Sequence, residues 1–194
     1  MLARRRYLRL LVGGSVATAG CAGRSGGGGP SLTVAGDSDL SIGADAFDDG
    51  AAIPERYTCD GDGVNPALTV DGVPADAESL ALVVDDPDAG DQPFVHWLLW
   101  GLPPDVGTVP RGVATTETVE ALGGARQGTN SAGKIGYVGP CPPTGDGPHT
   151  YRFRLFALDA DLQVAAGAKR GPLAEAINDH ALADALLTGT YERE

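Results

Sequence analysis

The sequence contains little lysine, methionine or cysteine, and acidic residues dominate its charge. Lysine occurs only at Lys134 and Lys169, and 14 Lys and Arg residues stand against 26 Asp and Glu residues, a formal net charge of −12. An acidic surface repels nucleic-acid phosphates and anionic lipid head groups, so we expect neither nucleic-acid binding nor docking on a charged lipid surface. Such a surface is typical of proteins that stay soluble at high ionic strength, where salt screens self-repulsion.

The cysteines are too few and too scattered to suggest a metal site. None belongs to a C-x-x-C pair, the spacing typical of zinc ligands, so we expect neither a metal nor another cofactor. If Cys21 is modified, Cys59 and Cys141 remain as an even pair that could form a disulfide in an oxidising compartment. The sequence leaves this bridge open, because it does not show whether the two Cα atoms lie within reach.

The N-terminal segment lacks an apolar run long enough to span a membrane. Residues 1–9 carry four arginines and no acid, and residues 10–20 are apolar or small. This run is well short of the ~20 apolar residues that a bilayer core needs, and the charged-then-apolar order predicts an export signal. Residues 4–9 (RRRYLR) resemble a twin-arginine signal, which is typical of export after folding.

A modification motif and a linker follow the signal. Residues 18–21 (TAGC) resemble a lipobox, which predicts that Cys21 is lipidated and anchors the exported chain to the outer face of the cell membrane. The glycine-rich stretch after it predicts a flexible tether. We therefore divide the chain into a signal peptide (1–20), a lipidated cysteine with its tether (21–35) and one folded domain (36–194). Removal of the signal takes away four arginines and no acid, so the formal charge moves from −12 to −16.

The apolar runs of the domain are short and separated by Gly, Pro and Asp, which predicts strands. Residues 80–84, 94–100 and 149–158 are the clearest, and the second is apolar on both faces, so we place it in the middle of a sheet. Strand periodicity would put His96 on the face of Leu98 and Trp100, and His149 on the face of Tyr151. The domain is predicted to be mainly β, a β-sandwich with a short helix near the C-terminus.

The predicted helix begins near Pro172, which suits a first turn, and ends at Gly189. Its apolar positions recur at helical spacing: Ile177, Ala181, Leu182, Ala185 and Leu186. His180 and Asp184 would lie four residues apart on it. That spacing can bind a metal, but a partly exposed helical pair is the favoured interpretation.

Three segments of the predicted β domain contain polar side chains that are not expected there by chance. Asp86 and Asp88 flank Pro87 in a turn after the first buried strand, His96 lies among large apolar neighbours, and the loop 139–143 (GPCPP) leads toward His149 and Tyr151. The prolines stiffen both the turn and the loop, so little ordering entropy would be lost when a ligand binds. Together they predict a preorganised pocket.

In this order the segments resemble the phosphatidylethanolamine-binding protein family, in particular its prokaryotic Raf-kinase-inhibitor-like (YbhB/YbcL-type) branch. The resemblance runs from about Phe47 to Arg193. Eight segments carry it: 57–61 (YTCDG), 65–68 (NPAL), 82–89 (LVVDDPDA), 95–97 (VHW), 136–143 (GYVGPCPP), 149–153 (HTYRF), 156–159 (FALD) and 189–193 (GTYER).

The resemblance implies a β-sandwich with a small cavity at one end that accepts phosphate-type head groups and other small anions. Carried over by position, the ligand-binding residues are Asp86, Asp88, His96, Gly139, Pro142, His149 and Tyr151. The sequence departs from the family at Gly90, where many members have a second proline. The long C-terminal segment of eukaryotic members is also missing, so their kinase regulation is not transferred.

The charges in such a pocket decide how it could bind an anion. Two carboxylates repel an anion unless hydrogen-bond donors in the pocket outweigh that repulsion. We assign Asp86 and Asp88 an orienting role and His96 and His149 direct contact, so binding should strengthen as the pH falls through the histidine range. Alternatively, the aspartates meet an ammonium group while the histidines meet its phosphate.

We expect a binding protein rather than an enzyme, and two other functions remain open. One is a hydrolase in which Asp86 and His96 activate water or Ser131 is the nucleophile, although no Gly-x-Ser-x-Gly motif is present. The other is a protease or kinase inhibitor that acts through a surface loop, with an unknown protein partner.

Overall fold

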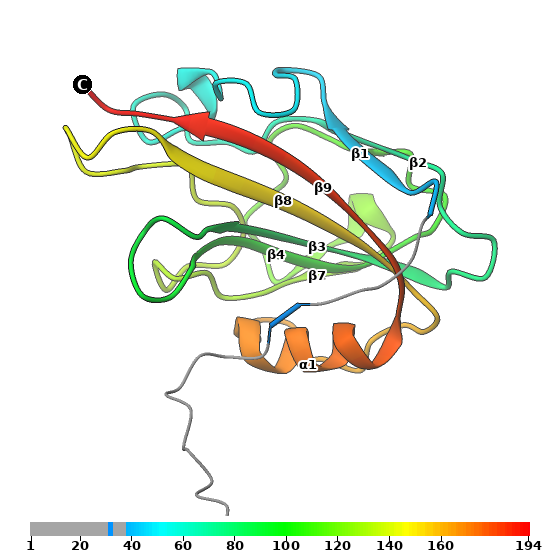
Figure 1. The fold of residues 1–194 in the computed structure, drawn as a ribbon. Helices are drawn as coiled ribbons and strands as arrows, with labels where there is room; N and C mark the ends of the chain where they lie inside the picture. Colours follow the sequence, from blue (N-terminus) through cyan, green and yellow to red (C-terminus); the bar gives the residue numbers. More distant parts are fainter. Residues whose placement is uncertain (1–30, 33–37) are drawn as a thin grey trace, which may run out of the picture.

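The computed structural model describes residues 31–32 and 38–194. The predicted signal, Cys21 and most of the predicted tether lie outside this range. Within it, two antiparallel sheets face each other and one helix covers the outer face of the larger sheet (Figure 1). The predicted mainly β fold with a short helix near the C-terminus is confirmed.

The smaller sheet has three strands in the order β1-β2-β5, and the larger has six in the order β6-β7-β4-β3-β8-β9. The bounds of the strands are β1 Ser41–Ala44, β2 Leu68–Asp71, β3 Ser79–Asp86, β4 Phe94–Leu102, β5 Thr108–Val109, β6 Thr118–Val119, β7 Ala125–Gln127, β8 His149–Leu158 and β9 Ala181–Tyr191. Two short 3-10 helices, η1 Glu55–Tyr57 and η2 Glu120–Leu122, and the helix α1 Arg170–His180 complete the elements.

The three strands predicted from apolar runs are present, and their order explains their composition. β3 lies between β4 and β8, and β4 lies between β7 and β3, so neither is an edge strand. Every residue of β3 is buried. A strand covered on both faces needs apolar side chains at successive positions, which is the pattern that the runs 80–84 and 94–100 display.

Two hydrophobic cores lie on opposite faces of the larger sheet. One fills the space between the sheets and includes Trp97, Tyr151 and Phe153. The other lies under α1 and includes Trp100 and Phe156. Successive side chains of β8 point alternately into the two cores, so one strand positions residues on both faces of the sheet.

The predicted extent of the helix is wrong. α1 ends at His180, and the residues expected to continue it form β9, which pairs with β8 along its whole length. Pairing with β8 satisfies the backbone groups of both strands, and this tertiary gain overrides the helical spacing of the apolar residues. Gly189 is not a helix stop, because it lies within β9. Glycine is needed there for packing, since a Cβ would lie 2.6 Å from Ile53 and 2.8 Å from Phe47.

The predicted helical pair of His180 and Asp184 is therefore also absent. His180 Nδ1 lies 2.8 Å from a carboxylate oxygen of Asp159, whereas Asp184 accepts a hydrogen bond from Arg154 across the β8–β9 pair. No helix of the described residues is both long and apolar enough to cross a membrane.

Candidate functional site

The Asp-Pro-Asp turn at the end of β3 is held by its own carboxylates. Asp86 Oδ1 accepts a hydrogen bond from the Asp88 amide at 2.8 Å, which closes the turn. Asp88 Oδ2 accepts one from the Thr150 amide at 2.8 Å, which fixes the turn to the beginning of β8. Both aspartates therefore hold backbone in place at the point where β3 ends and β8 begins.

Asp86 also positions a buried histidine. Its second oxygen lies 2.8 Å from His149 Nδ1, and both side chains are nearly inaccessible to solvent. Because a carboxylate only accepts hydrogen bonds, Nδ1 carries a proton and the ring presents Nε2 outward. Nε2 lies 3.4 Å from the exposed carboxylate of Asp146.

The environment of His149 favours its charged form. Burial disfavours the charge, but the hydrogen bond and charge of Asp86, supplemented by Asp146, outweigh burial and raise the pKa of His149 above its usual value.

His96 reaches the same region through an irregularity in β4 that the sequence does not reveal. Val84 pairs with Trp97 and Asp85 pairs with Val95, so His96 is the extra residue of a β-bulge. The bulge turns its ring toward Tyr151, with centroids 5.2 Å apart. The predicted face for His96, shared with Leu98 and Trp100, is therefore wrong, because the bulge breaks the two-residue period.

His96 differs chemically from His149. Its Nδ1 donates to the carbonyl of Val138 at 2.8 Å, and the Val138 amide donates back to the His96 carbonyl at 3.0 Å. Burial lowers the pKa of His96, although Val138 and the charge of Asp86 act in the opposite direction. Neutral His96 thus has a bare Nε2, which can accept a proton but not donate one.

Tyr151 brings a hydroxyl to the base of this region. It is almost fully buried, and its hydroxyl makes no well-aligned hydrogen bond within the described part of the chain. Burial and the charge of Asp86 raise its pKa, so it is a neutral donor at physiological pH. A buried hydroxyl without a partner is a group that a ligand can satisfy.

A cavity of about 250 Å³ opens beside these groups. Its lining consists of charged, proline and small residues: Asp86, Asp88, Ala89, Gly90, Cys141, Pro142, Pro143, Asp146 and His149. Four of them were proposed for ligand binding, Asp86, Asp88, Pro142 and His149, and Cys141 was proposed for the disulfide. Gly90 adopts a φ of +135°, which proline cannot reach, so the turn here differs from the proline-containing form. His96, Tyr151 and Gly139 lie outside this lining.

The wall formed by the proline-rich loop is fastened to η1. A disulfide joins Cys59 to Cys141, with Cα atoms 5.4 Å apart, and the Cys59 amide donates to the Pro140 carbonyl at 3.0 Å. Gly139 belongs to the same attachment, because a Cβ there would lie 2.8 Å from the backbone of Tyr57 and Thr58. Gly139 is therefore required for packing against this backbone.

The side chains expected to act together in a hydrolase are hydrogen-bonded to other groups. Asp86 pairs with His149, and His96 pairs with Val138, so the expected pair of Asp86 and His96 is not formed. Ser131 accepts a hydrogen bond from the Val95 amide and lines a different cavity, which contains no histidine. Among the described residues, no cluster of His, Cys, Asp and Glu could hold a metal ion.

Three contributors were not predicted from the sequence. Asp146 reaches His149, Val138 orients His96, and Arg152 binds buried Asp85 through two hydrogen bonds of 2.8 and 3.0 Å. The last pair neutralises a carboxylate adjacent to Asp86. Only the Asp85 pairing has a sequence signal, since an Asp inside an apolar run needs a partner.

Comparison with known proteins identifies the family. The profile of the phosphatidylethanolamine-binding protein family matches residues 43–192. The chain is 43% identical over 154 residues to the UPF0098 protein of Methanothermobacter thermautotrophicus, covering 79% of this chain and 99% of that protein. It is also 43% identical over 153 residues to LppC of Mycobacterium tuberculosis, which is named as a lipoprotein, covering 79% of this chain and 72% of that protein.

Solved structures agree with this result. A phosphatidylethanolamine-binding protein homolog from Chlamydia trachomatis superposes with a TM-score of 0.73 at 37% identity, and YbcL of Escherichia coli with 0.76 at 29% identity. Each alignment covers 81% of this chain and all of the other. The chain therefore belongs to the phosphatidylethanolamine-binding protein family.

Proposed function

We propose that this protein binds a small anionic ligand of the phosphate type in the cavity beside His149. The observation that carries the proposal is the buried Asp86–His149 pair at the edge of that cavity. Asp86 fixes the ring through Nδ1, so a second proton on His149 gives an Nε2–H donor with a positive charge facing the ligand. A charge-assisted hydrogen bond of this kind is stronger than a neutral one.

Tyr151, His96 and the two aspartates have different roles in the proposed site. The Tyr151 hydroxyl makes no well-aligned hydrogen bond within the described residues and supplies a neutral donor, while bare Nε2 of His96 suits a ligand oxygen that carries a proton. Asp86 and Asp88 have carboxylate oxygens committed to His149 and to backbone amides, so they position donors instead of contacting the ligand. Protonation of His149 is then the step that turns an acidic cavity into an anion site.

We favour binding over catalysis for this site. A hydrolase needs a base within reach of water or of a nucleophile, whereas here Asp86 is hydrogen-bonded to His149 and His96 to Val138. The test is a panel of phosphate and carboxyl esters incubated with the protein. Turnover that is lost in His149→Gln or His96→Ala would overturn this assignment, whereas binding without turnover supports it.

Calorimetry with inorganic phosphate and phosphorylethanolamine tests the binding proposal. We expect affinity to rise as the pH falls through the histidine range, and His149→Gln to weaken binding roughly ten- to hundredfold, since hydrogen bonds to charged groups contribute ~1.5–3 kcal/mol. His180→Gln is the matched control, because His180 also lies 2.8 Å from an aspartate but is exposed and remote from the cavity. Equal losses in both variants, or affinity independent of pH, would contradict the proposal.

We further propose that the chain is exported and anchored by a lipid at Cys21, on the outer face of the cell membrane. The support is the arginine-rich segment, the TAGC motif before the domain, and a relative named as a lipoprotein. Labelling cells with a radioactive fatty acid should mark the wild-type chain and not Cys21→Ser, which should appear in the soluble fraction. Label in both variants would refute anchoring at Cys21.

A further inference from the structure

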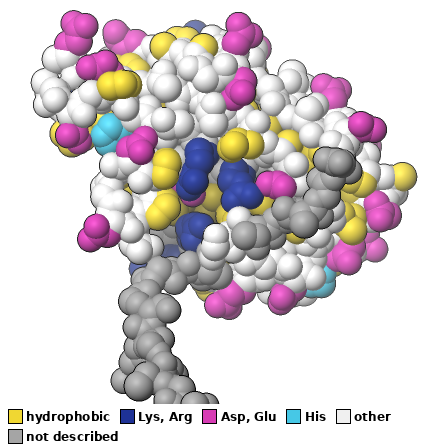
Figure 2. Space-filling model, in the orientation of Figure 1, with side chains coloured by type: hydrophobic (Ala, Val, Ile, Leu, Met, Phe, Trp, Pro, Cys, Tyr) yellow, Lys and Arg dark blue, Asp and Glu magenta, His cyan; other side chains and the backbone are white. Residues whose placement is uncertain are grey.

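The last described residues of the chain lie beside the loop that carries Asp146. β9 ends at Tyr191, which pairs with His149 at the beginning of β8. The chain then continues next to residues 143–148, here called the rim loop, at the end of the molecule where β8 begins (Figure 1). Acidic side chains are visible around this end of the molecule in Figure 2. Arg193 therefore contributes a positive charge to mainly acidic surroundings.

Arg193 is fixed in place by a two-pronged ion pair with Asp60. Its Nε and Nη2 atoms each donate to the Asp60 carboxylate at 2.9 Å, and the Tyr191 hydroxyl donates to the same carboxylate at 2.8 Å. The hydrogen bonds from Arg193 and then from Tyr191 hold the pKa of Asp60 below its usual value, so the carboxylate is charged at physiological pH. Because the guanidinium fork matches both carboxylate oxygens, the pair fixes the orientation of the chain end as well as its distance from Asp60.

The rim loop has few other attachments. Pro142 before it and His149 after it are buried, but residues 143–146 are exposed. An added Cβ at Gly145 or Gly147 would meet no neighbouring atom, so packing at these positions does not hold the loop. The Gly145 amide donates to the Arg193 carbonyl at 3.1 Å, and no other backbone hydrogen bond joins residues 143–147 to the rest of the described chain. The position of the loop tip therefore depends on Arg193.

The beginning of the rim loop is attached to the same segment as Arg193. Cys141, two residues before the loop, forms the disulfide with Cys59, and Asp60 is the next residue after Cys59. The loop is thus held at its beginning by the disulfide and at its tip by Arg193, and both attachments lead to residues 59–60. Loss of the Asp60–Arg193 pair would release the tip while the beginning of the loop stays fixed.

The rim loop carries one of the carboxylates that act on His149. Asp146 Oδ2 lies 3.4 Å from His149 Nε2, and the Asp146 amide donates to the Pro143 carbonyl at 3.2 Å within the loop. Burial opposes the charged form of His149, whereas Asp86 and Asp146 favour it. Asp146 is the titratable group near this ring that belongs to the rim loop. The other titratable groups around it lie on the strands or on the turn after β3: Asp86, Asp88, His96, Tyr151 and Tyr191.

We propose that Arg193 is a positioning residue of the anion cavity, because through its pair with Asp60 it holds the rim loop with the Asp146 carboxylate beside His149. Arg193 is not among the residues that line the cavity, so it acts through Asp146 and not on the ligand. The consequence for binding rests on the function proposed above: the contact with Asp146 sets the pH range in which His149 becomes a charged donor. The positioning itself is independent of any ligand and can be measured in the free protein.

NMR titration of the His149 ring in the free protein tests this role. Asp60→Ala combined with Arg193→Ala removes the pair without changing the net charge. We expect the proton affinity of the ring to fall roughly two- to fivefold, which corresponds to losing the effect of one exposed carboxylate. In Asp146→Asn, the same double substitution should cause no further fall, since two changes that act through one contact are not additive.

Arg56→Ala combined with Asp62→Ala is the matched control. These side chains form an exposed ion pair at 2.8 Å from positions that flank residues 59–60, and their removal also keeps the net charge. The control should leave the titration of His149 unchanged. An equal fall in the control, the same fall in the Asp146→Asn background, or no fall at all would overturn the proposal.

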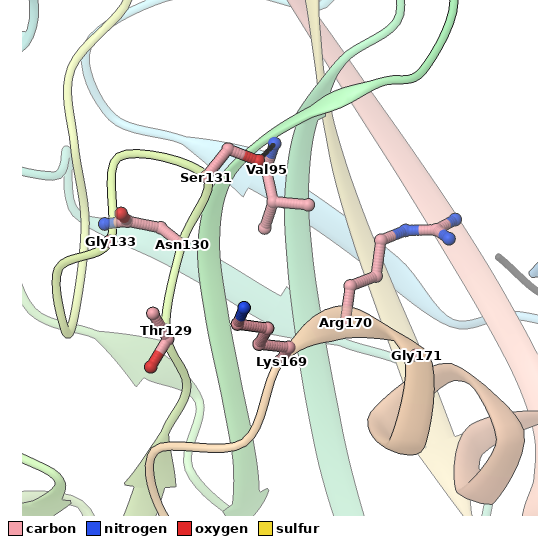
Figure 3. A pocket seen from close by; sticks show the side chains of 8 residues that line it. All are labelled: Val95, Thr129, Asn130, Ser131, Gly133, Lys169, Arg170 and Gly171. Carbon is pink, nitrogen blue, oxygen red and sulfur yellow. Dashed lines mark hydrogen bonds between the residues drawn. The ribbon is translucent and has the colours of Figure 1, made fainter. Parts of the chain in front are cut away.

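Calorimetry with inorganic phosphate distinguishes failure of this proposal from failure of the proposed function. The pH at which binding develops should move lower in the variant that lacks the Asp60–Arg193 pair, together with the titration of His149. A separate cavity, of about 360 Å³, lies beside the beginning of α1, has Lys169 extending into it and has no carboxylate in its lining (Figure 3). Phosphate binding that is lost in Lys169→Gln and kept in His149→Gln would refute the proposed function, whereas the titration in the free protein would still decide the role of Arg193.

Discussion

At the scale of single residues, the two buried histidines of the site have opposite preferences for a proton. Asp86 holds Nδ1 of His149 and favours its charged form, whereas His96 is bonded to a neutral carbonyl and is kept neutral by burial. Their roles in the cavity follow from these partners. The raised pKa of His149 favours a charged donor, and the lowered pKa of His96 favours an uncharged acceptor.

The two histidines should therefore affect stability in opposite ways as the pH changes. The raised pKa of His149 stabilises the fold fully below its unfolded value of about 6.5, and this stabilisation is lost as the pH rises through the folded pKa. The lowered pKa of His96 stabilises the fold above about 6.5, and this is lost as the pH falls through the folded pKa. Urea unfolding across this range should show His96→Gln to be less sensitive to acid than wild type, and His149→Gln to have lost the stabilisation at low pH.

His180→Gln, at an exposed histidine outside the cavity lining, serves again as the matched substitution. Parallel pH profiles for His96→Gln and His149→Gln would contradict the opposite preferences of the two rings.

Asp146 should compete with the ligand for His149. Its carboxylate is exposed and lies 3.4 Å from Nε2, the atom that would donate to an anion. Asp146→Asn should strengthen phosphate binding roughly two- to fivefold, since exposed ion pairs are worth ~0.2–1 kcal/mol. It should also lower the pKa of His149, which NMR titration of the ring measures without any ligand. Asp91→Asn, an exposed change in the neighbouring β3–β4 turn, is the control. Weaker binding in Asp146→Asn would show that Asp146 helps to hold the ligand.

At the scale of secondary-structure elements, the sequence predicts the regular strands but not the places where the two-residue side-chain period of a strand is interrupted. The buried strands β3, β4 and β8 follow from apolar runs, because each run is covered on both faces. The bulge at His96 has no local signal such as glycine or proline, and it depends on pairing with β3 and on the Val138 loop. The residues of the site could thus be named, but the side of the sheet on which His96 lies could not be.

The helix boundary near His180 has the same explanation. Residues 181–186 have helical spacing of apolar side chains, and only β8, more than twenty residues away in sequence, provides the edge that makes them a strand. A local sequence pattern carries no information about long-range strand pairing. For the same reason it does not predict that His180 contacts Asp159, or that Asp184 accepts a hydrogen bond from Arg154.

The disulfide that joins Cys59, two residues after η1, to Cys141 in the proline-rich loop should control both stability and the shape of the cavity. Its cysteines are 82 positions apart, and closing a loop of that size stabilises the fold by up to about 4 kcal/mol through the entropy of the unfolded chain. Replacing both cysteines with serine should lower the free energy of unfolding by roughly 2–4 kcal/mol and weaken phosphate binding, because Cys141 lines the cavity. Unfolding in urea and calorimetry measure the two effects.

Wild type treated with a reductant should match the doubly substituted variant. Full affinity in either form would show that the hydrogen bonds of the loop, such as Cys59 to Pro140 and Tyr137 to Tyr57, hold the cavity wall without the bridge.

At the scale of the whole molecule, charge is unevenly distributed, and this changes what the composition implies. A formal charge of −12 indicates repulsion from anionic surfaces when it is treated as uniform. On the face seen in Figure 2, Lys and Arg side chains instead lie close together, with Asp and Glu side chains around them. The net charge therefore does not describe every face of the molecule.

The same excess of carboxylates should make the folded state depend on salt. Repulsion among acidic groups is greater in the compact state than in the unfolded chain, and it is screened over about 10 Å at 0.1 M salt and about 3 Å at 1 M. We therefore expect the melting temperature of the protein to rise with sodium chloride over this range, by a few degrees per ~1 kcal/mol gained. Differential scanning calorimetry measures the effect without a denaturant. Unfolding in guanidinium chloride would not be suitable, because this denaturant is itself a salt. The Arg152–Asp85 pair is shielded by burial of Asp85, so it should be weakened far less than the exposed repulsion is relieved. A melting temperature that falls with salt would mean that ion pairs such as this one outweigh the repulsion among the carboxylates.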